Sequence, residues 1–327
     1  MKKMIGFITV LVILLSVAFV TETKKQATKE KEIPIVGILQ LTSHPALDKI
    51  YEGIMDALKE EGFVDKKNIK IDFQNAQGDQ SNLKTMSERF ANEQAAVMVG
   101  IATPSAQALA NASKEIPIVL GAVTDPKGAG LVADNQHPGG NITGVSDLTP
   151  IKAQFNLIKT LLPNAKKIGI IYSSSEDNSV VQGKQAEEEA KKSGLEPITA
   201  TVSSTNDVNQ VATNLAEKVD AIYVPADNTV ASAMNTLISV TDAKGIPVFP
   251  AVDTMVAEGG LATVGLNQYE LGKMTGKMTA DLLKGKKKAA TTPIEYLKHG
   301  DTIINPKKAE KLGITIPKEM LDHAIIN

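Results

Sequence analysis

The chain has 327 residues, of which 43% are hydrophobic and 22% are charged, a globular balance with length enough for two domains. A net charge of −2 and an aromatic content of 4% without any Trp argue against nucleic-acid binding. The absence of Cys excludes disulfides, thiolate metal sites, a Cys nucleophile and a lipid-modified Cys.

The first 20 residues have the pattern of an export signal. Lys2 and Lys3 precede an apolar run over residues 4–20, in which Ser16 and Ala18 suit a cleavage site. The run is long for a signal peptide, so an uncleaved N-terminal membrane anchor remains the alternative. Residues 21–32 are rich in Lys and Glu and are expected to form a linker. Both alternatives predict an exported protein, at the extracellular face of the membrane or in the periplasm.

Beyond residue 32, apolar strands alternate with amphipathic helices in two successive units. In the first unit we expect strands at 33–40, 69–75, 96–101, 117–123 and 141–147, and helices at 45–61, 80–92, 104–113 and 150–162. In the second we expect strands at 167–173, 195–202, 221–226 and 246–251, and helices at 179–193, 207–217 and 229–244. Residues 260–267, a helix at 269–284 and a short strand at 293–298 follow, and we expect this last part to pass back between the two units.

Several strands are apolar throughout, without alternation, which indicates burial on both faces of a parallel sheet covered by helices. Two of them, at 96–101 and 221–226, break into small polar residues and then a helix. Ligands of such sheets bind beyond the carboxyl ends of the strands, near helix N-termini. Because both units carry the same construction, the sequence predicts a binding cleft shared by two lobes.

No catalytic or cofactor motif is assembled in the chain. Residues 128–133 match the pattern G-x-G-x-x-A, but no strand leads directly into Gly128, so we expect a surface loop. Residues 272–277 fall short of a phosphate loop and lie within a helical pattern. The four His residues are scattered, and there is no G-x-S-x-G. We therefore expect a binding protein without metal or cofactor.

The candidate binding residues are the polar groups at strand ends. They are Thr42, His44, Thr103, Ser105, Asp125, Ser174, Glu176, Asn178, Asp227, Asn228 and Asp253. Each could equally be a helix N-cap, which Ser, Thr, Asp and Asn favour. Asp125 and Asp227 directly follow apolar strands, and a carboxylate there can pair with an ammonium group. Since Asn228 or Thr229 could cap the next helix, we expect the Asp227 carboxylate to be available to a ligand. Tyr51, Phe73, Tyr172 and Tyr223 are candidates for stacking on a ring, although core positions explain them as well.

An ordered set of stretches resembles the extracytoplasmic substrate-binding proteins of ABC transporters, in the branch that includes tryptophan-binding lipoproteins. They lie at residues 44–48, 103–107, 122–126, 138–147, 176–179, 226–229 and 269–272. The resemblance implies a type I periplasmic-binding-protein fold with three crossings between the lobes. It implies lobe one at 33–165 plus 266–288 and lobe two at 166–265 plus 289–327. This chain departs from the lipoproteins of that branch in having no Cys to acylate.

The function that follows is capture of a small solute, with an aromatic amino acid such as tryptophan or phenylalanine expected from the resemblance. Closure of the lobes on the ligand would precede delivery to an ABC permease, with the binding protein a monomer. One alternative is an exported or anchored α/β enzyme acting on a small polar substrate. Another alternative is a sensor lobe that reports its ligand to a signalling partner. It is disfavoured because the sequence shows no attached DNA-binding or signalling segment.

Overall fold

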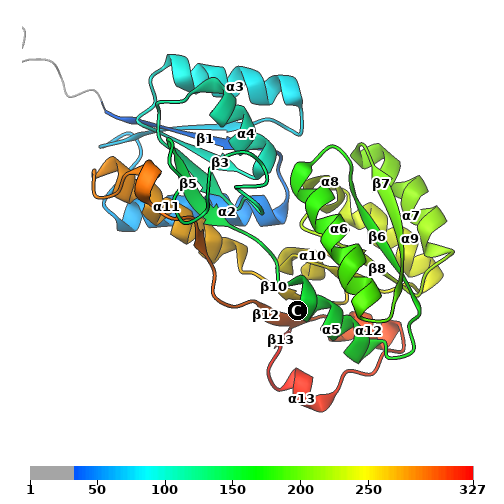
Figure 1. Ribbon diagram of the computed structural model, residues 1–327. Helices are drawn as coiled ribbons and strands as arrows, with labels where there is room; N and C mark the ends of the chain where they lie inside the picture. The colour runs from blue at the N-terminus through cyan, green and yellow to red at the C-terminus, as the bar shows by residue number, and fades with distance from the viewer. Residues whose placement is uncertain (1–32, 327) are drawn as a thin grey trace, which may run out of the picture. The chain divides into compact units, whose positions relative to one another are not determined.

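The computed structural model describes residues 33–326, so the expected export segment 1–20 and linker 21–32 lie outside the described residues. From Ile35 onward the chain forms two lobes, each built on a parallel sheet with helices on both faces (Figure 1). The predicted fold class is therefore confirmed. None of the helices within residues 33–326 has both the length and the apolar character needed to cross a membrane.

The first lobe contains a six-stranded sheet with the strand order β11-β5-β4-β3-β1-β2, in which all neighbours are parallel. Its strands are β1 (Ile35–Gln40), β2 (Lys70–Asn75), β3 (Val97–Ile101), β4 (Ile118–Gly121), β5 (Ile142–Ser146) and β11 (Glu295–Tyr296). Its helices are α2 (Pro45–Glu60), α3 (Gln80–Asn92), α4 (Thr103–Ala112) and α11 (Gln268–Leu283), with a short 3-10 helix at Ala289–Thr291. Helices α3 and α4 cover one face of the sheet, and α2 and α11 cover the other (Figure 1).

The second lobe contains a parallel sheet with the order β7-β6-β8-β9 and a small sheet with the order β10-β12-β13. Its strands are β6 (Lys167–Ser173), β7 (Glu196–Val202), β8 (Ala221–Val224), β9 (Val248–Pro250), β10 (Ala262–Gly265), β12 (Asp301–Ile304) and β13 (Ile325–Ile326). Its helices are α5 (Ile151–Leu161), α6 (Asp177–Lys192), α7 (Val208–Ala216), α8 (Asn228–Ser232), α9 (Met234–Lys244), α10 (Asp253–Ala257), α12 (Pro306–Lys311) and α13 (Lys318–Leu321), with a 3-10 helix at Thr205–Asp207.

The apolar strands of the second lobe are buried on both faces, as their composition predicts. On β6, Ile170 packs into the core on the side of α5 and α6, while Ile171 packs among α7, α8 and α9. On β8, Tyr223 and Ile222 divide between the same two cores. Because successive side chains of a strand point to opposite faces, a strand covered on both sides needs an unbroken apolar run.

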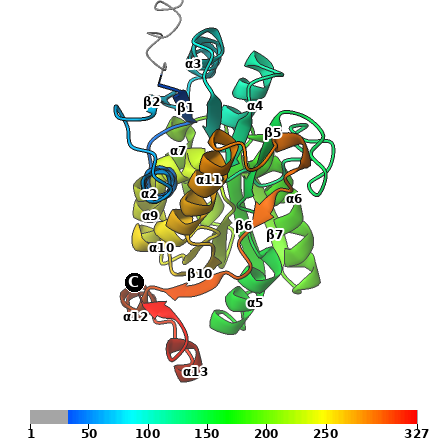
Figure 2. The same ribbon diagram turned by 90° about the vertical axis from the view of Figure 1, so that its left-hand side faces the viewer.

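The chain crosses between the lobes three times, at residues 147–150, 266–267 and 297–300 (Figure 2). Helix α5 packs on the second sheet, where the ring centroids of Phe155 and Tyr223 lie 5.1 Å apart. Strand β11 pairs with β5 of the first sheet. Residues 151–165 therefore belong to the second lobe and 289–296 to the first, unlike the expected boundaries. An amphipathic pattern shows that a helix has a buried face, but not which sheet covers it.

Two smaller differences concern the second half of the chain. The helix expected over 229–244 is interrupted at Ala233, which separates α8 from α9. Strand β12 pairs antiparallel with β10 and parallel with β13, a small sheet that the alternation did not predict. Short edge strands of this kind have too few residues for a periodic signal.

Helices α2 and α11 approach each other closely through three glycines. A Cβ placed on Gly53, Gly272 or Gly276 would lie less than 3.0 Å from a backbone oxygen of the facing helix. For Gly272 this atom is the carbonyl oxygen of Ile50. Around the contact, the Tyr269 hydroxyl donates a hydrogen bond of 2.9 Å to Asp56, and Lys273 forms an ion pair with Glu60. Because backbone oxygens cannot rotate away, only glycine is compatible with this separation.

We expect Gly272→Ala to destabilise the protein by about 3 kcal/mol, near the upper end for overpacking, since the obstacle is backbone. Gly140→Ala is the matched control, because a Cβ at Gly140 has no heavy atom within 4 Å. The free energy of unfolding of that variant should stay within about 0.5 kcal/mol of the wild-type value. Urea unfolding followed by circular dichroism measures both, and equal effects would contradict the steric argument.

Candidate ligand-binding site

A small cavity lies between the lobes, where carboxyl ends of strands from both sheets meet helix N-termini. Its volume is about 30 Å³, so a small solute can enter only if the surrounding walls move apart. The residues that line it are His44, Ala46, Leu47, Ala102, Thr103, Ala122, Thr124, Asp147, Asn178, Ala226, Asp227, Asn228, Ala231, Val252, Met255 and Gln268.

One wall of the cavity contains a hydrogen-bonded bridge between the lobes, formed by His44, Asn228 and Glu176. Asn228 donates through Nδ2 to Glu176 Oε2, so its Oδ1 is the acceptor for His44 Nε2 at 3.1 Å. This arrangement places the proton of His44 on Nε2. Burial lowers the pKa of His44 below its usual value, against the opposing effects of the Asn228 hydrogen bond and of the nearby carboxylates. A neutral His44 therefore joins the lobes through Asn228.

A second hydrogen-bonded bridge passes through Gln182, which is fully buried on α6. Gln182 Nε2 donates to Thr124 Oγ1 in the first lobe at 3.1 Å, and Gln182 Oε1 accepts from the backbone N–H of Ala226 at 3.3 Å. The Thr124 hydroxyl in turn donates to Asp147 Oδ1 at 2.9 Å. The polar side chains on both sides of the cavity are thus connected when the lobes are in contact.

Asp227 is the N-cap of α8, although the sequence analysis left its carboxylate available. Its Oδ1 accepts from the backbone N–H of Val230, and its Oδ2 from that of Ser173, both at 2.6 Å. Burial, followed by the charge of Glu176, raises the pKa of Asp227 to about 7. The expectation of an uncommitted carboxylate was therefore wrong, because Asn228 is engaged with His44 and Glu176 and does not cap the helix.

Two alanines that line the cavity have a left-handed backbone. Ala102, with a φ of 74°, follows β3, and Ala122, with a φ of 58°, follows β4. Such conformations are costly for non-glycine residues and concentrate at functional sites. Ala102 also occupies the N-cap position of α4 without a capping side chain. The N-terminus of α4, with Thr103 at its start, therefore faces the cavity without a protein cap.

The family model for the ABC transporter substrate binding protein matches residues 35–326. The chain belongs to this family. Its members bind solutes and are not enzymes, which decides against the enzyme alternative, and the family is extracytoplasmic.

A tyrosine-binding protein of Clostridioides difficile is 40% identical over 293 residues, which cover 90% of this chain and 84% of that protein. A Streptococcus pneumoniae domain in complex with L-Trp is 48% identical, covers 90% of this chain and 99% of the other, and superposes with a TM-score of 0.87. A ligand-free, open substrate-binding protein of C. difficile is 38% identical with the same coverage and a TM-score of 0.69. The fold of this substrate-binding protein is thus the type I periplasmic-binding-protein fold.

The cavity contains five of the eleven candidate residues that the sequence analysis selected. These are His44, Thr103, Asn178, Asp227 and Asn228. Glu176 lies behind the wall, and Thr42 lies with it in a neighbouring groove. Ser105 is fully buried beside the start of α4.

The remaining three candidates do not line the cavity. Asp125 closes its own loop by accepting from the N–H of Gly128, and Ser174 is exposed. Asp253 lies at the start of α10 and accepts from the N–H of Thr254, while burial raises its pKa to about 6. The Asp125 and Asp253 side chains thus serve a local turn and a helix start, while the Ser174 hydroxyl donates to the carbonyl of Val202 at 3.3 Å.

Three further polar residues line the cavity that the sequence pattern did not predict: Thr124, Asp147 and Gln268. Asp147 and Gln268 flank crossings between the lobes, where a strand end is followed by an extended segment or by a helix of the other lobe. A rule based on a strand running directly into a helix of the same unit could not select them. Proximity to a crossing would have been the useful signal.

The four aromatic candidates are all outside the cavity lining. Tyr223 and Tyr172 lie in the core of the second lobe. The rings of Tyr51 and Phe73 pack against each other at a tilt of 42°, with centroids 4.3 Å apart. Instead, the apolar part of the lining consists of aliphatic side chains and Met255, which is fully buried on α10.

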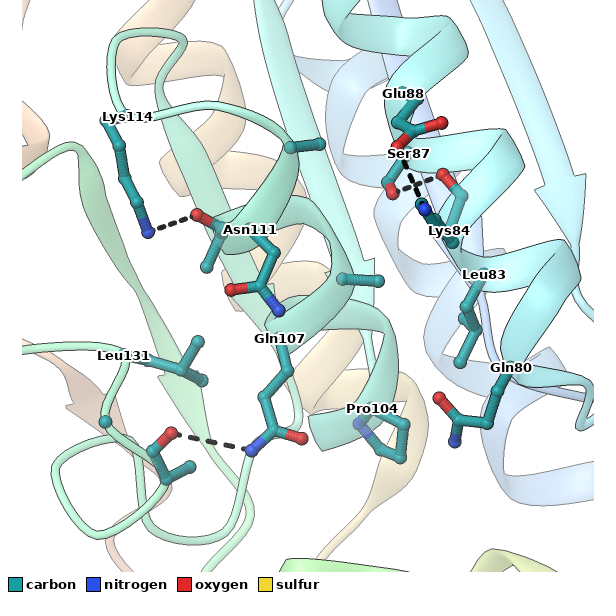
Figure 3. A pocket seen from close by; sticks show the side chains of 15 residues that line it. Gln80, Leu83, Lys84, Ser87, Glu88, Pro104, Gln107, Asn111, Lys114 and Leu131 are labelled. Atoms are coloured by element: carbon teal, nitrogen blue, oxygen red, sulfur yellow. Dashed lines mark hydrogen bonds and ion pairs between the residues drawn. The ribbon is translucent and has the colours of Figure 1, made fainter.

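A larger groove of about 720 Å³ lies in the first lobe alone, between α3, α4 and the loop at 129–131 (Figure 3). Gln107 and Asn111 of α4 face it from one side, and Leu83 and Lys84 of α3 from the other (Figure 3). No strand end of the second lobe reaches it, so it lacks the two-lobed construction of the cavity. We therefore place the ligand site in the cavity between the lobes.

We expect Asp227→Asn to destabilise the ligand-free protein by about 1–3 kcal/mol, because Asn offers one acceptor where two backbone N–H groups need one each. Asp79→Asn is the matched control. Asp79 caps α3 through a single hydrogen bond to Asn82 N and is exposed, so Asn should replace it with little effect. Thermal unfolding by calorimetry measures both variants. Equal melting temperatures for Asp227→Asn and the wild type would refute the two-acceptor role.

Proposed function

We propose that this substrate-binding protein captures an aromatic amino acid outside the cytoplasm and delivers it to an ABC permease. The observation that carries the proposal is the similarity to the L-Trp complex, at 48% identity and a TM-score of 0.87. The similarity to a tyrosine-binding protein supports the same ligand class. Calorimetric titration with individual amino acids would determine which aromatic amino acid the protein binds.

The lining of the cavity suits the three parts of such a ligand. The lining contains carboxyl and amide oxygens suited to an ammonium group, of which those of Asp227 already accept backbone N–H groups. The uncapped N-terminus of α4 at Thr103 supplies N–H groups for the carboxylate. The aliphatic lining with Met255 can hold the ring, since a thioether makes favourable contacts with aromatic rings.

Closure of the lobes accounts for retention of the ligand. His44 with Asn228 and Gln182 with Thr124 form hydrogen bonds across the cleft in the described arrangement. A ligand that contacts both lobes favours this closed arrangement over an open one, because the additional contacts exist only there. The volume of about 30 Å³ requires the lobes to separate before a ligand enters.

The N-terminal part fits the same function. We propose that residues 1–20 direct export or anchor the protein, and that the lobes act as a monomer. Deleting residues 1–20 and comparing secretion with the full chain tests the export role, and light scattering of the ligand-free protein tests the monomer.

We expect L-Trp, L-Tyr or L-Phe to bind with a Kd of about 1 μM or below, equivalent to roughly 8 kcal/mol. L-Lys and L-Glu should bind at least about a hundredfold more weakly, because the aliphatic lining cannot pair a second charge. Isothermal titration calorimetry with each amino acid measures this order. Preference for a charged amino acid, or turnover of any member of the panel, would reject the proposal.

Ligand binding should also compact the protein. Small-angle X-ray scattering is expected to give a smaller radius of gyration with saturating ligand than without it, because the lobes rotate together. The control is the same concentration of an amino acid that calorimetry shows not to bind. An unchanged profile with bound ligand would rule out closure as the mechanism.

A further inference from the structure

Three carboxyl groups lie in or beside the cavity, and among residues 33–326 none of them has a compensating cation in the lining. Asp147 and Asp227 line it, and Glu176 lies directly behind Asn228. Within residues 33–326, no Lys or Arg lines the cavity, and burial keeps the pKa of His44 low. Buried carboxylates without cations are unfavourable, so a ligand with a positive group gains by entering.

The three carboxylates differ in how many hydrogen bonds they already accept. Asp227 accepts a backbone N–H on each oxygen. Glu176 accepts from the Asn228 amide and from both the N–H and the hydroxyl of Thr229. Asp147 accepts on Oδ1 from the Thr124 hydroxyl, its own backbone N–H also donates to its carboxyl group, and burial raises its pKa. Among residues 33–326, no other side chain donates to it. Asp147 therefore keeps the greatest capacity to accept from a ligand.

A second acceptor in the same cavity is also without a partner. Asn178 is 6% exposed, and its Nδ2 donates to the carbonyl of Ala226 at 3.0 Å, which fixes the orientation of the amide. Its Oδ1 has no hydrogen-bond partner among residues 33–326. Asn178 lies one turn before Gln182 on α6, on the same side of the helix. Since Gln182 contacts Thr124, the partner of Asp147, both vacant acceptors are on the polar side of the cavity.

From these observations we propose that Asp147, on the first crossing between the lobes, is the carboxylate that binds the α-ammonium group, with Asn178 Oδ1 as a further acceptor. The inference rests on the proposed function and assigns the ammonium to Asp147 in place of Asp227. The Thr124 hydroxyl has one proton, and because Gln182 donates to its oxygen, that proton is directed to Asp147 Oδ1. The bridge through Gln182 thus orients Oδ2 for the ligand.

The test compares two probes in the full chain, L-Trp and indole-3-propionate, which lacks the α-amino group. We expect Asp147→Asn to weaken L-Trp binding about thirtyfold or more, as for loss of one partner of a buried charge pair. Indole-3-propionate should bind the variant at least as well as the wild type, because an unpaired negative charge has been removed. Calorimetric competition gives both Kd values.

The controls separate this role from folding and from the proposed function. Asp147→Ser, which also removes the charge, should reproduce the pattern if Asp147→Asn folds poorly. Asp79→Asn removes one charge from the same lobe outside the cavity and should leave both Kd values within about twofold. The inference is overturned if Asp147→Asn keeps its affinity for L-Trp within about threefold of the wild type. It is also overturned if the substitution weakens binding of L-Trp and of indole-3-propionate equally. Failure of the wild type to bind any aromatic amino acid overturns the proposed function itself.

Discussion

The contact of α2 with α11 through Gly53, Gly272 and Gly276 determines where the first lobe presents its binding groups. Helix α2 begins directly after His44, and α11 begins at Gln268, and both residues line the cavity. Since the two helices are in backbone contact and cannot slide past each other without collisions, their N-termini hold defined positions relative to each other. The glycines thus maintain the geometry of one wall of the site.

The second determinant is the distribution of hydrogen bonds around the cavity. Asp227 is committed to the backbone, Glu176 to Asn228 and Thr229, and Gln182 to both lobes. These bonds leave a few acceptors directed toward the interior, and the lining offers no cation among the described residues. A binding site of this kind selects by charge at one end and by shape at the other, as expected when recognition requires no chemical step.

The sequence predicted the fold class and most elements, because strands buried on both faces and amphipathic helices have strong periodic signals. It did not predict the lobe of α5 or the pairing of β11, which depend on contacts with distant strands. At the site, strand ends pointed to His44 and Asn178, which line the cavity, whereas Asp227 was misjudged, since capping depends on the backbone geometry of α8. Residues 272–277 were recognised as helical, but the close approach that requires their glycines is a tertiary property.

The three crossings also constrain how this protein can move. Each is short, and the third is held at both ends by strand pairing, of β11 with β5 and of β12 with β10. Backbone of fixed reach cannot lengthen, so the lobes can pivot about the crossings but cannot drift apart. Asp147 and Gln268 lie next to two of the crossings and also line the cavity, so we expect the lobes to part on the side away from them. We therefore expect the angle between the lobes to set the width of the opening to the cavity.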